Sequence, residues 1–308
     1  MSGLISVVVP TLNESEHVLR LLQSIRNQTY RPIEVVMVDV GSTDDTTLIA
    51  AQFAEQFSGK DFRLALVKAE VKVSAARNLG IQTSHGEHIL LLDADFILSD
   101  SGIVQQLNDA LETQDMAYFE TRTVVDSWLE YQLMLDAESP LFAHNTIAGW
   151  AFKRELLESF QFDESLEFGE DMDFMIRLSK SGLLRAKRIE SMGLRHFPHT
   201  LQQLRRQKLW YGRTAPVWVR KHHSLRELAI LSPLATFGLF VLILAAYFYS
   251  IILGVVLTVV FLSIPLALLR RSRTKGVRRM GYLLLVRTIY GSVFFSLGFV
   301  RGLFQLLL

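Results

Sequence analysis

Short apolar runs of strand length alternate with segments of helical periodicity through the first hundred residues. Val18, Leu21, Leu22 and Ile25 recur at the spacing of one helix face. Because strands that alternate with helices form parallel sheets with right-handed crossovers, this pattern predicts an α/β fold. We expect the first strand to end before Pro10, which cannot continue a central strand. The expected strands are residues 4–9, 33–38, 64–67 and 89–92, and the expected helices begin near residues 18, 47 and 74.

The run Ile89–Leu92 leads directly into two carboxylates, Asp93 and Asp95. A continuous apolar run predicts a strand that is buried on both faces. Since strand side chains alternate between faces, we expect both carboxylates to point the same way where this strand ends. Open α/β sheets bind ligands at that edge, and hard oxygen ligands suit Mg2+ or Mn2+. The alternative interpretation is a polar, Asp-rich turn after a strand.

The last third of the chain differs sharply from this pattern. Residues 228–269 contain no charged side chain, which is enough for two membrane-spanning helices that turn near residues 247–250. The basic run 270–279 predicts a cytoplasmic loop, and residues 281–308 predict a third span or an in-plane helix. Residues 201–227 mix basic and aromatic side chains, as interfacial segments do. We therefore expect a cytoplasmic catalytic domain at residues 1–200, an interfacial segment and a multi-pass membrane domain at residues 228–308.

Composition and charge exclude several classes of function. The 308 residues include no cysteine, which rules out disulfides, zinc–thiolate sites and cysteine nucleophiles. The formal net charge of +1 gives no basic field for nucleic acid. Neither a Gly-x-Gly-x-x-Gly after the first strand nor a Walker Gly-Lys-Ser/Thr is present, so dinucleotide and P-loop chemistry are disfavoured. The N-terminus has no basic region or cleavage site that would predict a signal peptide.

Polar residues at the expected strand ends indicate a site for a nucleotide. Asp39 follows the second strand and could accept hydrogen bonds from a base or a ribose. The guanidinium of Arg77 matches phosphate oxygens. Each residue also has an ordinary explanation, since Arg77 could lie on a helix surface and Asp44 could cap a turn.

Four motifs in this order resemble the inverting family 2 glycosyltransferases, which have the GT-A fold. They are residues 8–14 (VVPTLNE), 38–46 (VDVGSTDDT), 75–80 (AARNLG) and 93–95 (DAD). One departure is Val40, where the family often has Asp or Gly. The resemblance covers residues 4–212 and implies a Rossmann-like mixed sheet with helices on both faces, followed here by C-terminal transmembrane helices.

The resemblance also implies roles for residues of the second half. Residues 168–174 (FGEDMDF) look like the family's Glu-Asp motif, so Asp171 would be the general base and Glu170 its neighbour. Acidic residues at a helix N-terminus are otherwise explained by the helix dipole. His196 matches the late metal ligand of GT-A enzymes, with His199 in reserve. Gly149 would let the backbone approach the sugar. Trp150 would stack on a sugar unless it lies in the core.

These assignments give four groups of predicted site residues. The divalent cation, Mn2+ or Mg2+, would be held by Asp95 and His196. A lipid phosphate or acceptor would be contacted by Trp150, Arg205, Arg206 and Arg213. The catalytic pair would be Asp171 and Glu170. The donor would be bound by Pro10, Thr11, Asn13, Glu14, Asp39, Ser42, Arg77, Asp93 and Gly149.

The expected function is a membrane-anchored, metal-dependent inverting glycosyltransferase. It would move a sugar from a UDP- or GDP-sugar to a lipid or lipid-linked acceptor at the cytoplasmic membrane face. One alternative is a polyprenyl-phosphate monosaccharide synthase, whose ionised acceptor needs no base. Others are a nucleotidyltransferase, disfavoured because its glycine-rich loop is absent, and an inactive sugar-nucleotide-binding scaffold. A processive synthase is disfavoured because residues 207–210 (QKLW) only loosely match Gln-x-x-Arg-Trp.

Overall fold

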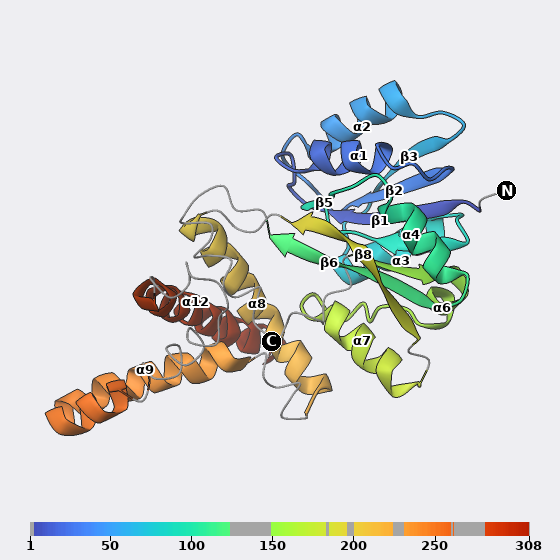
Figure 1. Ribbon diagram of the computed structural model, residues 1–308. Helices are drawn as coiled ribbons and strands as arrows, with labels where there is room; N and C mark the ends of the chain where they lie inside the picture. The colour runs from blue at the N-terminus through green and yellow to red at the C-terminus, as the bar shows by residue number, and fades with distance from the viewer. Residues whose placement is uncertain are drawn as a thin grey trace. The chain divides into compact units, whose positions relative to one another are not determined.

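A computed structural model describes most of the chain, in two compact units (Figure 1). The first unit comprises Met1–Val124 and Phe142–Phe197, and the second comprises Val125–Leu141 and Pro198–Leu308. Each unit is considered by itself. The described residues are 3–123, 149–182, 185–195, 200–223, 231–259, 261 and 281–307.

Within its described residues, the first unit is built on a mixed eight-stranded sheet in the order β3-β2-β1-β4-β7-β6-β8-β5. Strands β1 to β4 pair in parallel, whereas β7 runs antiparallel to β4 and β6. Strand β8 is parallel to β6 and antiparallel to β5. The strands are β1 (Ile5–Thr11), β2 (Ile33–Asp39), β3 (Phe62–Lys68), β4 (His88–Leu91), β5 (Phe96–Leu98), β6 (Met116–Thr123), β7 (Trp150–Lys153) and β8 (Ala186–Arg195).

Helices cover both faces of this sheet. Successive strand residues point to opposite faces, so Val7 and Val9 of β1 pack in one core cluster and Val8 packs in another. Figure 1 shows α1 and α2 on one side of the sheet and α7 on the other. The predicted mixed α/β fold is therefore confirmed. The first face is covered by α1 (Val18–Arg26), α2 (Thr46–Phe57) and α4 (Ile103–Leu111), and the second by α3 (Val73–Thr83), α6 (Arg154–Ser159) and α7 (Glu170–Lys180).

The first strand is longer than expected. Strand β1 continues through Pro10 to Thr11, where it pairs with Asp39 of β2. The ladder between β1 and β4 ends at Val8, paired with Leu91. Pro10 therefore lies where β1 pairs with β2 on one side, an edge-like position in which a missing N–H is tolerated. The prediction that Pro10 stops the strand was wrong for this reason.

The segment Asp93–Asp95 forms a turn between β4 and β5 and does not continue the strand. The backbone N–H of Phe96 donates to the carbonyl oxygen of Asp93 at 3.2 Å. The expectation that strand alternation aligns the two carboxylates was therefore wrong. The turn brings them together instead, and the alternative of an Asp-rich turn correctly describes its backbone.

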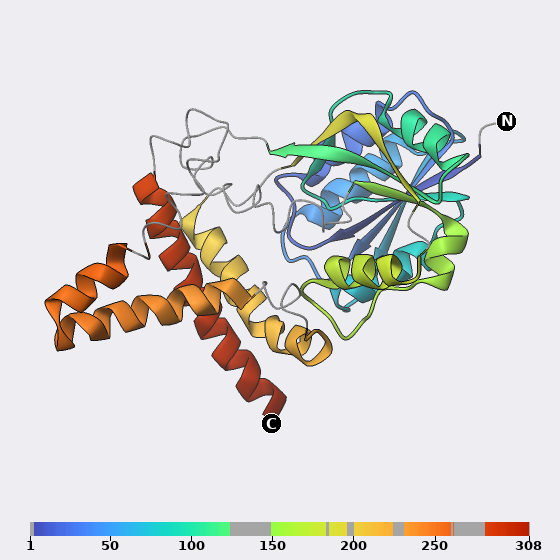
Figure 2. The ribbon, with the colours of Figure 1, turned by 60° about the horizontal axis from the view of Figure 1, so that its bottom comes forward.

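Among the described residues of the second unit, the long helices are α8 (Leu201–Lys221), α9 (Ser232–Tyr249) and α12 (Gly281–Leu307). Helices α8 and α12 cross closely because glycines lie at their contact, as Figure 2 allows the reader to follow. A Cβ atom on Gly212 would lie 1.9 Å from the carbonyl oxygen of Phe295. Gly298 and Gly302 approach the backbone of α8 just as closely. Small residues four apart are typical of tightly packed membrane helices.

One described helix is long and apolar enough to cross a membrane, judged by length and composition: the window Ile289–Leu306 of α12. The apolar stretch Pro233–Tyr249 in α9 is shorter. Helix α9 ends at Tyr249 and is followed by Ser250 in an extended conformation, within the range where a turn was expected, and residues 251–259 are again helical. The expected basic loop at 270–279 lies outside the described residues.

Candidate active site

The loops that follow β1 and β2 are held together by hydrogen bonds. The backbone N–H of Asn13 donates to Oγ of Ser42 at 2.8 Å, and Oδ1 of Asn13 accepts from the N–H of Thr43 at 2.8 Å. The N–H of Ser15 donates to Oδ2 of Asp44 at 3.1 Å. Asn13 and Ser42, predicted to contact the donor, therefore contact each other. These hydrogen bonds hold the two loops together at the carboxyl edge of the sheet.

Two aspartates in the second of these loops are well satisfied. Asp39 ends β2, is 3% exposed, and accepts hydrogen bonds from the backbone N–H groups of Gly41 and Ser42. Burial raises the pKa of Asp44, but hydrogen bonds from Thr46 and Ser15 outweigh it and lower the pKa from 3.8 to about 2. The loop itself therefore holds the carboxylate of Asp44 in its ionised form.

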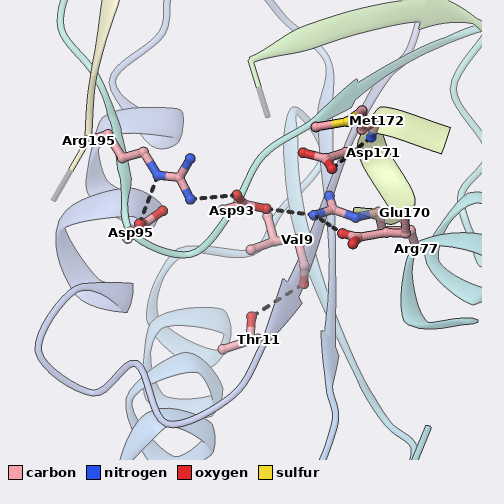
Figure 3. Close-up of polar contacts among 9 residues, drawn as sticks. All are labelled: Val9, Thr11, Arg77, Asp93, Asp95, Glu170, Asp171, Met172 and Arg195. Atoms are coloured by element: carbon pink, nitrogen blue, oxygen red, sulfur yellow. Dashed lines mark hydrogen bonds and ion pairs between the residues drawn. The ribbon is translucent and has the colours of Figure 1, made fainter. Parts of the chain in front are cut away.

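Arg77 comes from α3 and reaches the same edge (Figure 3). Its Nη2 donates to Oδ1 of Asp93 at 3.0 Å and to Oε1 of Glu170 at 3.3 Å. The residue is 4% exposed. Its Nε and Nη1 are buried and have no hydrogen-bond partner among the described residues. Since buried donors are normally paired, two unused guanidinium donors indicate a site prepared for an anion.

Asp93 and Asp95 both contact Arg195, a residue that the sequence did not single out. Nη2 of Arg195 donates to Oδ2 of Asp93 at 3.1 Å, and its Nε donates to Oδ2 of Asp95 at 3.0 Å. Burial raises the pKa of Asp93, but Arg77 and Arg195 outweigh it and lower the pKa overall. For Asp95, burial dominates and raises the pKa, with Arg195 opposing it.

The carboxylate of Asp95 fits a cation better than that of Asp93. Both oxygens of Asp93 are engaged by arginines, whereas Oδ1 of Asp95 is buried with no hydrogen-bond partner in the described part of the chain. No group of three or more His, Asp or Glu side chains gathers as a metal site among the described residues. A Mg2+-like cation commonly uses one or two carboxylates together with substrate phosphates, so one open carboxylate suffices.

The start of α7 supplies two further carboxyl groups. Gly169 adopts φ +73 at the N-cap, a left-handed conformation that glycine tolerates, and turns Glu170 inward. Burial, reinforced by Asp171, raises the pKa of Glu170 from 4.5 to about 8. Burial also raises the pKa of Asp171, while Arg77 opposes the shift. Asp171 accepts a hydrogen bond from the N–H of Met172 and is partly exposed.

Glu14 shares the electrostatic environment of this cluster. Burial, reinforced by Asp95 and Asp93, raises its pKa from 4.5 to about 8. Its backbone N–H donates to Oγ1 of Thr46 at 2.8 Å, which ties the loop after β1 to α2. Four predicted residues are joined by direct contacts through arginine, and Glu14 and Asp171 interact with them electrostatically. The joined residues are Arg77, Asp93, Asp95 and Glu170.

Several other predicted residues have structural contacts. Gly149 adopts φ +91, and a Cβ there would lie 2.9 Å from the ring of Phe119. Trp150 is 9% exposed and stacks on Tyr118 with ring centroids 4.4 Å apart, so its placement favours the core role over sugar stacking. Pro10 is buried in β1, and the hydroxyl of the buried Thr11 donates to the carbonyl oxygen of Val9.

The remaining predicted residues lie elsewhere. Arg205, Arg206 and Arg213 are exposed on α8 in the second unit. The guanidinium of Arg205 lies 5.4 Å from the ring centroid of Phe294 on α12. His196 and its reserve His199 lie outside the described residues.

Comparison with known proteins identifies the family of the chain. Residues 6–180 match the family described as glycosyl transferase family 2. The amylovoran biosynthesis glycosyltransferase AmsB of Erwinia amylovora is 27% identical over 197 residues, which are 58% of this chain and 64% of that protein. Glycosyltransferase GlyG of Streptococcus pneumoniae is 34% identical over 117 residues, 37% of each chain. The matches thus span less than two thirds of these relatives.

Two solved structures share the fold. The mannosyltransferase PcManGT from Pyrobaculum calidifontis, in complex with GDP-Man and Mn2+, aligns with a TM-score of 0.57 and 20% identity, covering 99% of this chain and 88% of that one. S. aureus TarS 1-349 in complex with UDP aligns with a TM-score of 0.51 and 16% identity, covering 97% of this chain and 91% of that one. At such identities the likeness shows the fold. Because the family match spans more than half of its residues, the chain belongs to glycosyl transferase family 2.

Proposed function

We propose that this member of glycosyltransferase family 2 transfers a sugar from a nucleotide-diphosphate sugar to a lipid or lipid-linked acceptor, with inversion at the anomeric carbon. The observation that carries the proposal is the cluster at the carboxyl edge of the sheet. There two buried nitrogens of Arg77 and one buried oxygen of Asp95 have no partner among the described residues, and Arg77 also contacts Glu170 of α7. In that cluster Arg77 would bind an anion, Asp95 a cation, and Asp171 the acceptor.

The donor side of the proposal involves Asp39, Arg77 and Asp93. Asp39 lies at the end of β2 and would accept from the base or ribose. The free nitrogens of Arg77 would contact the diphosphate, because a guanidinium fork matches phosphate oxygens. Asp93 would face the ribose or the sugar. Structural neighbours with bound UDP, UDP-GlcNAc and GDP-Man support a UDP- or GDP-sugar as the donor class.

A divalent cation, Mn2+ or Mg2+, would be held by Asp95, with His196 as a proposed second ligand. The buried and unpartnered Oδ1 of Asp95 supports this assignment. The mixed oxygen and nitrogen ligand set suits Mn2+. When bound, the cation would supply charge that neutralises the departing diphosphate. The fold neighbour with GDP-Man carries Mn2+, which adds support.

Asp171 would act as the general base on the acceptor side. The acceptor oxygen forms a bond to the anomeric carbon, the carbon–phosphate oxygen bond breaks, and its electron pair leaves with the diphosphate. The hydroxyl proton passes to the carboxylate of Asp171. Burial raises the pKa of this group above its ordinary value, which makes it a stronger base. Glu170, which is paired with Arg77, would orient the cluster.

The second unit supports a membrane location and a lipid acceptor. Large apolar side chains are strongly exposed around the end of α9: Phe248 is 95%, Tyr249 88% and Ile252 78% exposed. Such a surface is stable in contact with lipid. We extend the proposal to a hairpin that turns at Ser250, with α12 as a further membrane helix and the catalytic domain at the cytoplasmic face. The exposed Arg205, Arg206 and Arg213 would contact lipid phosphates.

The proposal is tested by incubating membranes that contain the full chain with Mn2+ and a panel of UDP- and GDP-sugars. Nucleotide diphosphate release and labelled lipid product are measured. We expect one donor to be turned over, with loss of turnover in Asp95→Asn and not in Asp109→Asn. Asp109 is exposed on α4 and accepts a hydrogen bond from Gln105, so it is a matched control. No turnover of any donor, together with equal nucleotide-sugar binding by wild type and Asp95→Asn, would favour a scaffold instead.

A further inference from the structure

Arg195 occupies a bridging position between the two aspartates of the 93–95 turn. It is the last residue of β8 and pairs with Phe96 of β5, directly after that turn. Its Nε donates a hydrogen bond to Oδ2 of Asp95 at 3.0 Å, and its Nη2 donates one to Oδ2 of Asp93 at 3.1 Å (Figure 3). The guanidinium also lies 5.1 Å from the ring centroid of Phe96. The positively charged Arg195 therefore contacts both carboxylates to which the proposed function assigns binding of the donor (Asp93) and of the metal ion (Asp95).

This arrangement balances the charges of the ligand-free site. Asp93 lies between two guanidiniums, since Arg77 engages Oδ1 and Arg195 engages Oδ2. Oδ2 of Asp95 contacts Arg195, whereas its Oδ1 has no hydrogen-bond partner among the described residues. The two guanidiniums therefore compensate the charges of Asp93 and Asp95, and Arg77 also contacts Glu170. A divalent cation that approached Asp95 would meet the like charge of Arg195 at short range, and this repulsion is strong in a partly buried site.

We propose that Arg195 is an internal counter-cation that competes with the divalent cation for Asp95 and Asp93, so that the cation binds well only together with the nucleotide diphosphate. This inference rests on the proposed function. Arg195 is thus a positioning residue for the transfer reaction. It lowers the affinity for the cation in the empty site and couples cation binding to donor binding.

The diphosphate makes this coupling possible because it brings negative charge. In a complex with both ligands, the diphosphate oxygens would compensate the charge of the cation and that of the Arg195 guanidinium. Without the diphosphate no such compensation exists, because the guanidinium of Arg195 already contacts Oδ2 of Asp95. Coupling between two ligands is reciprocal, so the cation raises the affinity for the nucleotide by the same factor as the nucleotide raises that for the cation.

The experiment measures binding of Mn2+ to the full-length protein in detergent by electron paramagnetic resonance of free Mn2+, with and without UDP or GDP. Wild type, Arg195→Gln and Arg195→Lys are compared. Arg188→Gln is the matched control, because Arg188 lies on the same strand and pairs with the exposed Glu120. Circular dichroism establishes that each variant is folded.

We expect wild type to bind Mn2+ weakly without nucleotide and more than about tenfold more tightly with UDP or GDP, within the usual range of coupling between sites. Arg195→Gln should bind Mn2+ without nucleotide about tenfold more tightly than wild type, with reduced coupling. Arg195→Lys keeps the charge and should stay close to wild type, as should Arg188→Gln. A guanidinium with a purely structural role would instead make Lys and Gln behave alike.

The outcomes separate this inference from the proposed function. If Arg195→Gln is folded and binds Mn2+ no better than wild type, or keeps the full coupling, the counter-cation role is wrong and the metal site stands. If Arg195→Gln does not fold, an Arg195→Lys variant whose affinity for Mn2+ alone rises clearly above that of wild type overturns the inference. If wild type binds no Mn2+ even with UDP and GDP, both the inference and the proposed metal site fail.

Discussion

Two regions at the carboxyl edge of the sheet are both rich in carboxyl groups, but the pKa of Asp44 is lowered in one region and that of Glu170 is raised in the other. In the loops after β1 and β2, hydrogen bonds lower the pKa of Asp44 to about 2 and orient Asp39. In the cluster between the 93–95 turn and α7, burial raises the pKa of Glu170 to about 8. Buried atoms of Arg77 and Asp95 also lack partners there among the described residues.

This difference distinguishes the loops after β1 and β2, which have a structural role, from the cluster that the proposed reaction uses. A loop whose polar groups are all paired holds its shape without a ligand, which suits a platform for a base and a ribose. A cluster with unsatisfied buried groups is costly by itself and is stabilised when a ligand completes it. The pairing of polar atoms therefore distinguishes the two regions better than residue type, since both are rich in aspartate. Each of the following variants is chosen to break one region and spare the other.

The largest effect is expected from Asp95→Asn in the cluster. Loss of the carboxylate charge removes the proposed cation ligand, and kcat/KM for the accepted donor should fall about 10³-fold, equivalent to several kcal/mol of transition-state stabilisation. Initial rates in membranes with Mn2+ measure it, and Asp109→Asn serves as the control. A loss of less than fivefold would show that Asp95 is no metal ligand in the reaction.

A smaller loss is expected from Asp171→Asn. Removing a general base lowers kcat by about 10²-fold or more when the acceptor is a hydroxyl, while binding of the donor persists. The measurement is kcat with a hydroxyl acceptor and, separately, with a lipid phosphate. Unchanged transfer to a lipid phosphate would refute the assignment of Asp171 as base and favour a polyprenyl-phosphate sugar synthase.

In the loop region, Asp44→Ala should affect stability more than chemistry. The variant loses the hydrogen bonds to Thr46 and Ser15, at a cost of about 1 kcal/mol, or roughly 3 °C in Tm. Because folding lowers the pKa of Asp44 from 3.8 to about 2, its stabilisation is present above pH 4 and is lost as the pH falls towards 2.

Calorimetry of the full chain between pH 2 and 7 tests this loop prediction. The difference in Tm between wild type and Asp44→Ala should shrink at the acid end. A loss of activity as large as that of Asp95→Asn would contradict the separation of scaffold from chemistry.

The last prediction, for Glu170→Gln, concerns the pH dependence of stability. The pKa of Glu170 is about 8 in the folded chain against 4.5 as the ordinary value, so the folded state keeps a proton that the unfolded state has released. Stability should therefore fall as the pH rises from 4.5 to 8. Glu170→Gln should flatten this decline in a pH series of Tm values, whereas the exposed Glu55→Gln on α2 should not. If Tm declines with pH as steeply in Glu170→Gln as in wild type, another group is responsible for the pH dependence.

Local sequence patterns predicted most of the fold and the centre of the site. The alternation of apolar runs with helical segments predicted the first four strands, and the apolar run before Asp93 predicted the sheet edge where Asp93 and Asp95 lie. The role of Arg195 was missed because it depends on the pairing of β5 with β8, which brings residues 100 positions apart into contact. For Trp150 the sequence left a choice, and its stacking on Tyr118 follows from the β6–β7 pairing. Such contacts between distant strands have no local signature.

The central claim is that Asp95 joins a cation to a nucleotide diphosphate at this edge of the sheet. The most direct measurement is a calorimetric titration of UDP and GDP into the full-length protein, with and without Mn2+, for wild type and Asp95→Asn. We expect Mn2+ to raise the affinity of wild type for one nucleotide by about tenfold or more, and to leave that of Asp95→Asn unchanged. Equal enhancement by Mn2+ in both proteins would contradict the claim.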